Sequence, residues 1–416
     1  MKYLRKNVLI FPASNAVALE YFRSLRHTKN FNLFGASTDG AGPLVFDNHL
    51  LVQAQATDRA LINEELPKIV EEQKIDLIIP TNDDAIYEMS FLENLPTPGI
   101  ASSIQTCRFK SKTYESLKGA VRVPQPRTSA PCFVKPDRGQ GSQDARLIES
   151  DAELSALSKD PSLLFSEYIE GPEFTIDCFS NFKGNVLYVQ PRNRLRIANG
   201  ITMDSSPADP GMFLETAEAI QKALPMRGAW FFQAKVTDKG EVVVLEVATR
   251  ISSNSGFSRA CGVNLPLLTV FDAFEENVQI RHSNVVSRYI RSLNGHYQYD
   301  FQFQRLYIDL DDTLIIHGKI NAHLVAYICH CRNEGKEIFL LTKHATDPVK
   351  TLESKGLLGL FQQIIWLEDR SQPKWKHIQP HSLVIEDSWQ ERTEIANNIA
   401  EHVWCFGPEI VDCLLK

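Results

Sequence analysis

The sequence lacks any apolar run that is long enough to cross a membrane. Such a span needs about 18 consecutive apolar residues, and no segment of the 416 residues provides them. The first 19 residues are similar to a signal peptide, with a basic head and then apolar residues, but Pro12, Ser14 and Asn15 interrupt the apolar part. We therefore predict a strand over 7–11, a turn and a helix that begins near Asn15, and no association with a membrane.

A paired-cysteine motif is also lacking. The eight cysteines are scattered and form no CxxC motif, which argues against a metal site or a disulfide framework. Cys329 and Cys331 are two residues apart on a predicted helix, so their side chains should point to different faces. This usage favours buried, reduced thiols in a cytoplasmic protein.

An excess of basic residues is absent as well. The chain has 44 Lys and Arg against 51 Asp and Glu, which gives a net charge of −7 and a pI near 5.9. This balance argues against nucleic acid as the main partner, although a local basic cluster can still hold a small anion. Hydrophobic residues make up 43% and charged residues 23%, which is typical of a globular protein. At about 150 residues per domain, the length predicts two to three domains.

Three blocks follow one another along the chain. Residues 1–105 alternate short apolar strands with helices, which predicts an α/β domain with a parallel sheet. Residues 106–295 are richer in strand patterns and contain a glycine-rich turn at 137–142. The polar and aromatic stretch 292–304 is typical of a connector, and the α/β alternation returns over 303–416.

The sharpest local signal is the segment LYIDLDDTL at 306–314. An apolar strand ends there in two acids, Asp309 and Asp311, that are spaced by one residue and followed by a hydroxyl. In a parallel sheet, the carboxyl ends of the strands face the ligand crevice. Two carboxylates at this place can hold Mg²⁺, and one of them can attack phosphorus to form an aspartyl-phosphate.

Later residues supply the groups that this chemistry still needs. Thr342 ends an apolar strand and offers a hydroxyl to a phosphate oxygen, and Lys374 offers a positive charge for the developing anion. Glu386 and Asp387 end the strand SLVIED and could complete a metal site.

This ordered set resembles the motifs of the haloacid dehalogenase-like (HAD) phosphohydrolases over residues 305–416. The resemblance implies a Rossmann-like domain in which Asp309 is the nucleophile and Asp311 the general acid/base. Thr342 and Lys374 would bind the phosphoryl group, with Lys376 as a competitor for the lysine role. The implied Mg²⁺ ligands are Asp309, Asp311, Glu386 and Asp387, with Glu391 as an alternative to Glu386.

The spacing between the first two motifs predicts a domain without a large cap. Only residues 314–341 separate them, which leaves no room for a large lid. We therefore expect an open site, suited to a bulky substrate or to one that the rest of the chain delivers.

A second anion site is predicted in the middle block. Lys135 ends a strand and precedes a loop that contains Gly139, Gly141 and Ser142. Glycines let backbone N–H groups approach a phosphate, so this loop suits a phosphate cradle, although most glycine-rich turns are only turns.

Further residues strengthen this prediction. Glu173 could accept hydrogen bonds from ribose hydroxyls. The strand VVVL ends in Glu246, with Gln233 on the preceding strand, and this pair could hold Mg²⁺ on a triphosphate. Three arginines are spaced by two residues along a predicted strand, so they lie on one face: Arg192, Arg194 and Arg196. They suggest binding of an anionic substrate or a γ-phosphate, and the alternative is a solvated surface.

Together, residues 5–290 resemble an ATP-grasp ligase of the carbamoyl-phosphate-synthase-like branch, which includes forms fused to a HAD domain. The segments that carry the resemblance are DLIIPTND (76–83), CRFKSKTYESL (107–117), EVATR (246–250) and GVNLP (262–266). The resemblance implies a pre-ATP-grasp parallel-sheet domain, then an α+β ATP-grasp domain that binds ATP and Mg²⁺, with Mn²⁺ as a substitute. It implies ATP contacts by Lys110 (alternate Lys112), Lys135, Gly139, Gly141, Ser142, Glu167, Tyr168, Ile169, Glu173, Arg194 and Arg196, metal contacts by Gln233 and Glu246, and a catalytic role for Arg250.

Two positions depart from the family pattern. Ala248 stands where the family usually has Asn, which removes one oxygen ligand, and Asp144 replaces the last glycine of the phosphate loop. Asn254 is the nearest amide to the metal position, but it lies further along the chain.

The hypothesis that joins these motifs is a bifunctional biosynthetic enzyme. It combines a carboxylate–amine ligase, working through an acyl-phosphate, with an Asp-nucleophile phosphatase. The expected small-molecule partners are a carboxylate, an amine and a phosphorylated substrate. For the oligomeric state, the hypothesis includes a homodimer. Two alternatives stay open: a small-molecule kinase joined to the phosphatase, and an ATP-binding regulatory module attached to an active phosphatase, which Ala248 favours.

Overall fold

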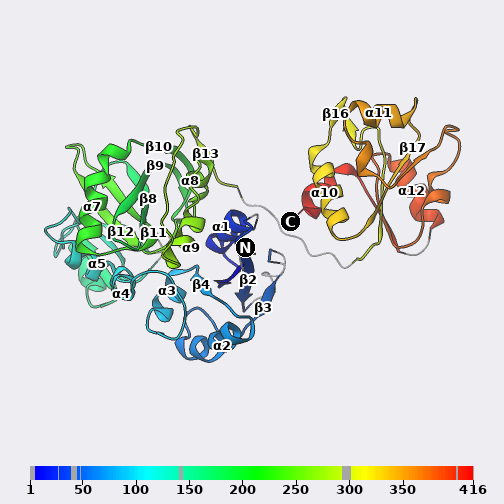
Figure 1. Ribbon diagram of the computed structural model, residues 1–416. Coiled ribbons are helices and arrows are strands. Elements are labelled where there is room, and N and C mark those ends of the chain that lie inside the picture. The colour runs from blue at the N-terminus through cyan, green and yellow to red at the C-terminus, as the bar shows by residue number, and fades with distance from the viewer. Residues whose placement is uncertain are drawn as a thin grey trace. The chain divides into compact units, whose positions relative to one another are not determined.

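The computed structural model divides the chain into two compact units, residues 1–293 and residues 294–416 (Figure 1). The described residues are 5–26, 28–38, 45–46, 48–139, 144–292, 301–399 and 402–415.

The first unit begins with a four-stranded parallel sheet in the order β3-β2-β1-β4. Side chains of β1 alternate between the two faces, so that Val8 and Ile10 pack with α1 while Leu9 and Phe11 pack with α2. Helix α1 begins after Asn15, whose side chain accepts hydrogen bonds from two backbone N–H groups, which confirms the predicted start. The elements are β1 (Lys6–Phe11), β2 (Phe31–Ser37), β3 (His49–Leu51), β4 (Leu77–Pro80), α1 (Ala16–Leu25), α2 (Arg59–Glu72), α3 (Asp83–Met89) and α4 (Ala101–Cys107).

The rest of the first unit contains two antiparallel sheets. The three-stranded sheet has the order β6-β5-β7, and the six-stranded sheet has the order β12-β11-β8-β9-β10-β13. The strands are β5 (Cys132–Pro136), β6 (Arg146–Ile148), β7 (Leu163–Ser166), β8 (Glu173–Ser180), β9 (Val186–Ala198), β10 (Ile201–Pro207), β11 (Gly228–Val236), β12 (Val242–Ala248) and β13 (Tyr289–Ile290). The helices are α5 (Lys110–Leu117), α6 (Asp151–Leu157), η2 (Pro210–Met212), α7 (Leu214–Ala223), α8 (Gly256–Ala260) and α9 (Leu265–Ala273).

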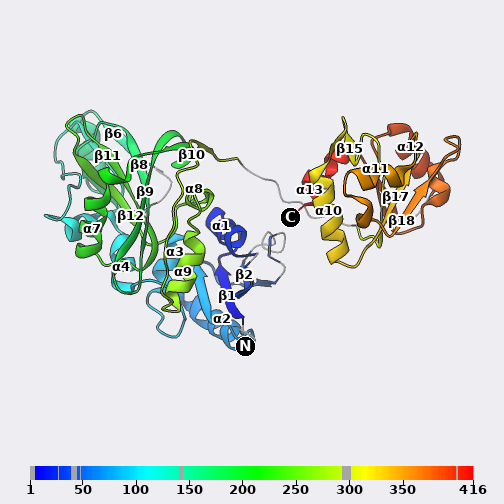
Figure 2. The same ribbon diagram turned by 45° about the horizontal axis from the view of Figure 1, so that its top comes forward.

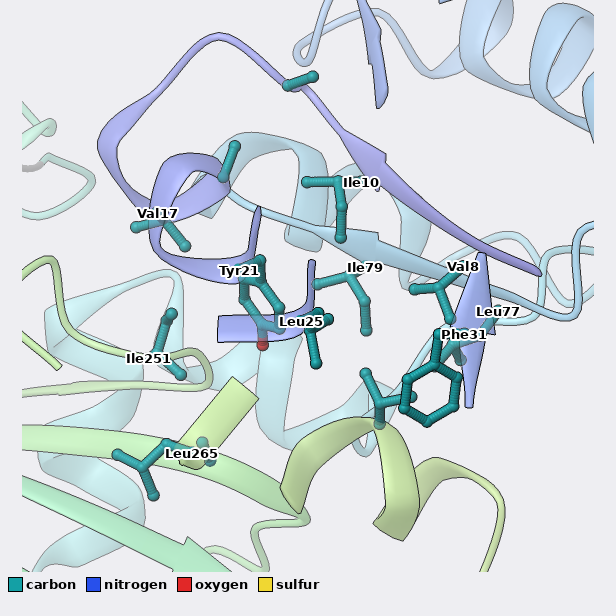
Figure 3. Packing of buried hydrophobic residues seen from close by; sticks show 14 of the residues in the cluster. Val8, Ile10, Val17, Tyr21, Leu25, Phe31, Leu77, Ile79, Ile251 and Leu265 are labelled. Carbon is teal, nitrogen blue, oxygen red and sulfur yellow. The ribbon is translucent and has the colours of Figure 1, made fainter. Parts of the chain in front are cut away.

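One hydrophobic core joins the parallel sheet to the antiparallel region (Figure 3). Val17 and Tyr21 of α1 belong to the same buried cluster as Ile251, which follows β12, and Leu265 of α9. Because this core is shared, the two blocks predicted before residue 295 pack as a single compact unit.

The second unit contains a five-stranded parallel sheet in the order β18-β17-β14-β19-β20. Figure 2 labels two of these strands, β17 and β18. Leu306 and Ile308 of β14 share a buried cluster with α10, whereas Tyr307 belongs to the cluster that contains Ile395 of α12. The two clusters therefore lie on opposite faces of the sheet. The strands are β14 (Arg305–Ile308), β15 (Ile315–Ile316), β16 (Lys319–Ile320), β17 (Glu337–Thr342), β18 (Gln363–Trp366), β19 (Ser382–Ile385) and β20 (Val403–Phe406). The helices are α10 (Ala322–Asn333), α11 (Pro348–Ser354), η3 (Leu358–Leu360), η4 (Lys374–His377), α12 (Trp389–Asn398), η5 (Pro408–Ile410) and α13 (Val411–Leu414).

Two structural observations concern the cysteines and the length of the apolar helices. The eight cysteines all lie in the described part of the chain and are free, with Cys329 exposed and Cys331 buried on α10. Across the described ranges, no helix combines the length and the apolar character that a membrane crossing requires.

Candidate functional site

A cavity lies where residues of the three-stranded sheet approach those of β11 and β12 in the first unit. We call it the first cavity. Strands β5 and β7 and the residues after β7 supply one wall, and β8, β11 and β12 supply the other. The predicted nucleotide-site residues that line it are Lys110, Lys135, Gly139, Glu167, Tyr168, Ile169, Glu173, Gln233 and Glu246.

Two lysines give the first cavity a positive wall. Lys135 ends β5, and its ammonium donates to the hydroxyl of Tyr114 at 2.6 Å and to the carbonyl of Leu245 at 3.2 Å. Lys110 begins α5 and donates to the carbonyl of Gly139 at 3.3 Å. Burial lowers the pKa of Lys135 to about 8, and the nearby Lys110 ammonium lowers it further, against nearby carboxylates that raise it. An anion between the two lysines would relieve this repulsion.

Glu167, Tyr168 and Ile169, which were predicted to contact ATP, directly follow β7. The carboxylate of Glu167 accepts hydrogen bonds from the Arg122 guanidinium at 2.6 Å and from the backbone N–H of Gln125 at 2.7 Å. Burial would raise the pKa of Glu167, but these two donors hold it below its usual value. The Glu167 side chain is therefore held by structural partners rather than free to meet a ligand.

Lys235 is a cavity residue that the sequence reasoning missed. It lines the first cavity from β11, donates to the carbonyl of Ile169 at 2.8 Å and lies 5.1 Å from the ring centroid of Tyr168. Lys235 is two residues after Gln233, so the period of a strand places both side chains on the same face. That spacing was the signal that could have identified it.

A second cavity, of about 450 Å³, adjoins the first. Gln233 and Glu246 line both cavities and stand opposite each other across β11 and β12. An amide oxygen and a carboxylate at this place are oxygen donors of the kind that Mg²⁺ prefers. The arginines that line the second cavity are Arg192, Arg194 and Arg250.

Arg250 forms a bidentate ion pair with Asp83 at the start of α3. Its Nε and Nη2 atoms donate to the two carboxylate oxygens at 2.7 and 2.8 Å. Burial would raise the pKa of Asp83, but the Arg250 guanidinium lowers it below its usual value. This pair connects the parallel-sheet region to the segment after β12, two regions that are 167 residues apart in the chain.

Arg194 is also committed to protein partners. It forms an ion pair with Glu173 and donates to the hydroxyl of Thr202 at 2.9 Å and to the carbonyl of Gly200 at 2.6 Å. The Glu173 carboxylate, predicted to face a ribose, is thus already engaged by an arginine.

Other predicted contacts lie elsewhere. Lys112 is exposed, with its ammonium 4.4 Å from the ring centroid of Phe109, and Arg196 is exposed near the end of β9. In the described part of the chain, neither residue lines the first or the second cavity. Gly141 and Ser142 lie outside the described residues.

The second unit gathers three acids at the ends of two adjacent strands. Asp309 follows β14, and Glu386 and Asp387 follow β19, which pairs with β14 in parallel. One carboxylate oxygen from each lies within 4.8 Å of the others. Such a set fits the oxygen coordination that Mg²⁺ prefers.

Lys374 is buried between two of these acids. Its ammonium donates to Asp309 at 2.7 Å and also forms an ion pair with Glu386. Burial alone would lower the pKa of Lys374, but the two carboxylates raise it. Burial raises the pKa of Asp309. Burial and the nearby charge of Asp309 raise the pKa of Glu386 to about 7.

Asp311, which was predicted to be a general acid/base and a metal ligand, is not one of the three acids of this cluster. Its two carboxylate oxygens lie 2.9 and 2.8 Å from Nδ1 of His344, and Nε2 of His344 lies 3.1 Å from the Thr351 hydroxyl. The sequence reasoning missed His344, although it stands two residues after Thr342. Thr342 is fully buried at the end of β17, and its hydroxyl accepts a hydrogen bond from the backbone N–H of His344.

The two alternatives considered for this site are not part of the acid cluster. Lys376 is exposed on η4, with its ammonium 5.6 Å from the ring centroid of Trp375. Glu391 pairs with Lys343 at 2.5 Å. Neither belongs to the cluster formed by the described acids.

A family model described as "ATP-grasp in the biosynthetic pathway with Ter operon" matches residues 159–293. The 3-methyl-D-ornithine–L-lysine ligase of Methanosarcina barkeri is 28% identical over 233 residues, which are 52% of this chain and 61% of the relative. The protein of the same name from Methanosarcina acetivorans is 26% identical over 233 residues, with the same two coverages. The chain spans about 61% of the length of these curated relatives.

Solved structures share the fold of the first unit. The biotin carboxylase domain of the Hydrogenobacter thermophilus 2-oxoglutarate carboxylase, in complex with Mg-ADP, ADP and bicarbonate, is 16% identical with a TM-score of 0.56, covering 67% of this chain and 71% of that one. The L-amino acid ligase of Bacillus licheniformis is 18% identical with a TM-score of 0.53, covering 66% and 75%. The family model and the relatives support the predicted ATP-grasp ligase resemblance, and the structures show a shared mixed α/β fold.

Proposed function

We propose that the first unit is an ATP- and Mg²⁺-dependent ligase that joins a carboxylate to an amine. The observation that carries the proposal is that Lys110 and Lys135 line the same cavity as Gln233 and Glu246, the two candidate metal ligands. The second cavity shares that pair, so a carboxylate held there would lie beside the phosphate end of a nucleotide.

The chemistry follows from these placements. Lys110 and Lys135 bind phosphate oxygens, and Mg²⁺ held by Gln233 and Glu246 would neutralise charge on the triphosphate. The substrate carboxylate attacks the γ-phosphorus, the bond to the bridging oxygen breaks, and ADP leaves. The amine then attacks the acyl carbon of the acyl-phosphate and releases inorganic phosphate. The relatives are named as ligases of amino acids, which supports amino acids as a substrate class.

The second unit is proposed to be an Asp-nucleophile phosphatase of the HAD type. Asp309 attacks the phosphorus of a phosphate ester, while Lys374 and Thr342 stabilise the developing negative charge. Asp311 gives a proton to the leaving oxygen and later takes one from the water that hydrolyses the aspartyl-phosphate. The Asp309, Glu386 and Asp387 cluster fits Mg²⁺, which would supply further charge neutralisation.

On this proposal the chain is a bifunctional biosynthetic enzyme, and its free thiols support a cytoplasmic location. A second candidate for the first unit is a nucleotide-binding module without turnover. Ala248 favours it, because an alanine at the end of β12 offers no oxygen to a metal.

An ADP-release screen of carboxylates crossed with amines tests the ligase proposal. It uses the Asp309→Asn variant, so that phosphorylated products are not removed. The ligase predicts ADP formation only when an acid and an amine are both present. ADP formation without an amine would indicate a kinase, and ATP binding without ADP formation across the whole screen would indicate the module.

A further inference from the structure

We infer that the second cavity binds a free amino acid as a zwitterion, with Arg192 recognising its carboxylate and Asn254 its ammonium group. This inference rests on the proposed ligase function, because the cavity is where that function places a substrate. It goes further by naming which groups of the substrate are recognised and by which side chains.

Arg192 has unused hydrogen-bond donors at this cavity. It lies on β9, its side chain is 1% exposed, and it lines the second cavity. Its Nη2 atom donates to Asp177 at 2.9 Å and to the hydroxyl of Ser252 at 2.9 Å. Its Nε and Nη1 atoms have no hydrogen-bond partner among the described residues. A buried donor without a partner destabilises the protein, so a ligand that brings an acceptor to these nitrogens would be favoured.

Asn254 has an unused acceptor at the same cavity. The residue is 3% exposed and lines the second cavity. Its Nδ2 atom donates to the carbonyl of Thr202 at 2.7 Å, which fixes the orientation of the amide. Its Oδ1 atom has no partner within the described part of the chain. An unused oxygen of this kind accepts a hydrogen bond from an ammonium group.

The other arginines of the cavity are already satisfied. Arg250 is held by Asp83, and Arg194 is held by Glu173, Thr202 and Gly200. Of these three arginines, Arg192 is the one with unused N–H groups among the described residues.

The charges and donors together favour a ligand of zero net charge. Asp177 forms an ion pair with Arg192 at 2.9 Å, so the positive charge of the arginine is balanced. A plain carboxylate would leave the oxygen of Asn254 without a donor, and a plain amine would leave Arg192 without an acceptor. A zwitterion brings one acceptor group and one donor group and satisfies both.

Calorimetric titration of the full chain tests the inference. The probes are individual L- and D-amino acids, each titrated with and without a non-hydrolysable ATP analogue and Mg²⁺. Every amino acid that binds is compared with two analogues. One is its carboxamide, which lacks the carboxylate, and the other is the carboxylic acid with the same side chain and hydrogen in place of the ammonium group (the deamino acid). We expect both matched analogues to bind at least tenfold more weakly.

Two variants and two controls locate the contacts. Arg192→Lys keeps a positive charge beside Asp177 but removes Nε and Nη1, and Asn254→Leu removes the amide oxygen. Each should weaken amino acid binding at least tenfold and leave the affinity for the ATP analogue unchanged. The controls are Ser255→Ala, a buried neighbour outside the cavity lining, and Arg288→Lys, an exposed arginine that pairs with the buried Asp204. Both controls should bind amino acids as the wild type does.

Several outcomes would overturn the inference. They are no amino acid binding in either condition, deamino acids that bind as well as amino acids, or full affinity in both cavity variants. Equal weakening in the controls would also overturn it. Failure of the proposed ligase function gives a different result. In that case the wild type does not bind the ATP analogue, but the titrations without nucleotide still measure amino acid binding.

Discussion

The ammonium of Lys374 lies 2.7 Å from the carboxylate of Asp309, and the same ammonium forms an ion pair with Glu386. One buried cation therefore holds together two acids that follow neighbouring strands of the second unit.

Replacing Lys374 by Gln should destabilise the second unit. The substitution leaves two carboxylates buried without a cation, and breaking such a pair costs about 3–5 kcal/mol. Because Mg²⁺ would replace the missing charge, adding it should restore more stability to this variant than to the wild type. Denaturant unfolding with and without Mg²⁺ measures both effects. Lys376→Gln is the matched control, since Lys376 is exposed, and equal losses in the two variants would contradict the account.

ATP affinity should fall as the pH rises above about 8. The folded-state pKa of Lys135 is lowered to about 8 by burial, so above that pH the charged form that binds phosphate disappears from the free protein. Below pH 8 the lysine is charged and the affinity should be constant. We expect a loss approaching tenfold per pH unit above 8, measured as the dissociation constant of an ATP analogue between pH 7 and 9.5. Lys135→Arg stays charged over this range, and an identical slope in that variant would show that Lys135 is not the titrating group.

Gly171→Ala should destabilise the first unit strongly. Gly171 has φ of +126°, which side-chain-bearing residues rarely adopt, and an added Cβ would lie 2.0 Å from the carbonyl oxygen of Val236. We expect a loss of about 3 kcal/mol or more from strain and overpacking together. Gly240→Ala is the control, because φ is +79° there but no atom lies within 4 Å of the added Cβ. Its cost should be about 1–2 kcal/mol, and thermal unfolding compares the two. Equal losses would mean that the contact with Val236 carries no energy.

Breaking the Asp83–Arg250 pair should weaken the first unit and leave the second unaffected. Asp83→Asn removes the charge that balances a mostly buried guanidinium, and we expect a loss of about 1–3 kcal/mol. Phosphate release by the second unit should not change, since that site contains neither residue. Glu64→Gln, at an exposed pair with Lys68, should change stability by less than about 0.5 kcal/mol. An Asp83→Asn variant as stable as the wild type would show that the pair does not hold the two regions together.

The sequence indicated those residues of the candidate sites whose positions depend on short-range pattern. Asp309, Thr342 and Glu386 each stand at the end of an apolar strand, and the carboxyl ends of parallel strands meet at one edge of a sheet. Lys135 and Glu246 also follow apolar runs, and the structure brings them to one cavity. The order of strands in each sheet and the shared core of the first unit were not predictable, because they depend on contacts between distant segments.

Long-range partners account for most of what the sequence did not predict. The pairing of Asp311 with His344 joins residues 33 apart, and no local pattern indicates it. The period of two predicted three arginines on one face of β9, but the pairing of β9 with β10 is irregular between Arg194 and Arg196, and burial ends along the strand, so that Arg192 is buried and Arg196 is exposed. The first two predicted blocks share a hydrophobic core and form one compact unit, which composition along the chain does not indicate.

The most direct test of the two-site account measures ADP release and phosphate-ester hydrolysis in parallel on three proteins. These are the wild type, Lys135→Ala and Asp309→Asn, assayed with an acid–amine pair from the screen and with p-nitrophenyl phosphate. Asp309→Asn should abolish ester hydrolysis and keep ADP release, and Lys135→Ala should lower ADP release about 100-fold or more and keep ester hydrolysis. If either substitution reduced both activities to the same extent, the account of two separate phosphate sites on one chain would be contradicted.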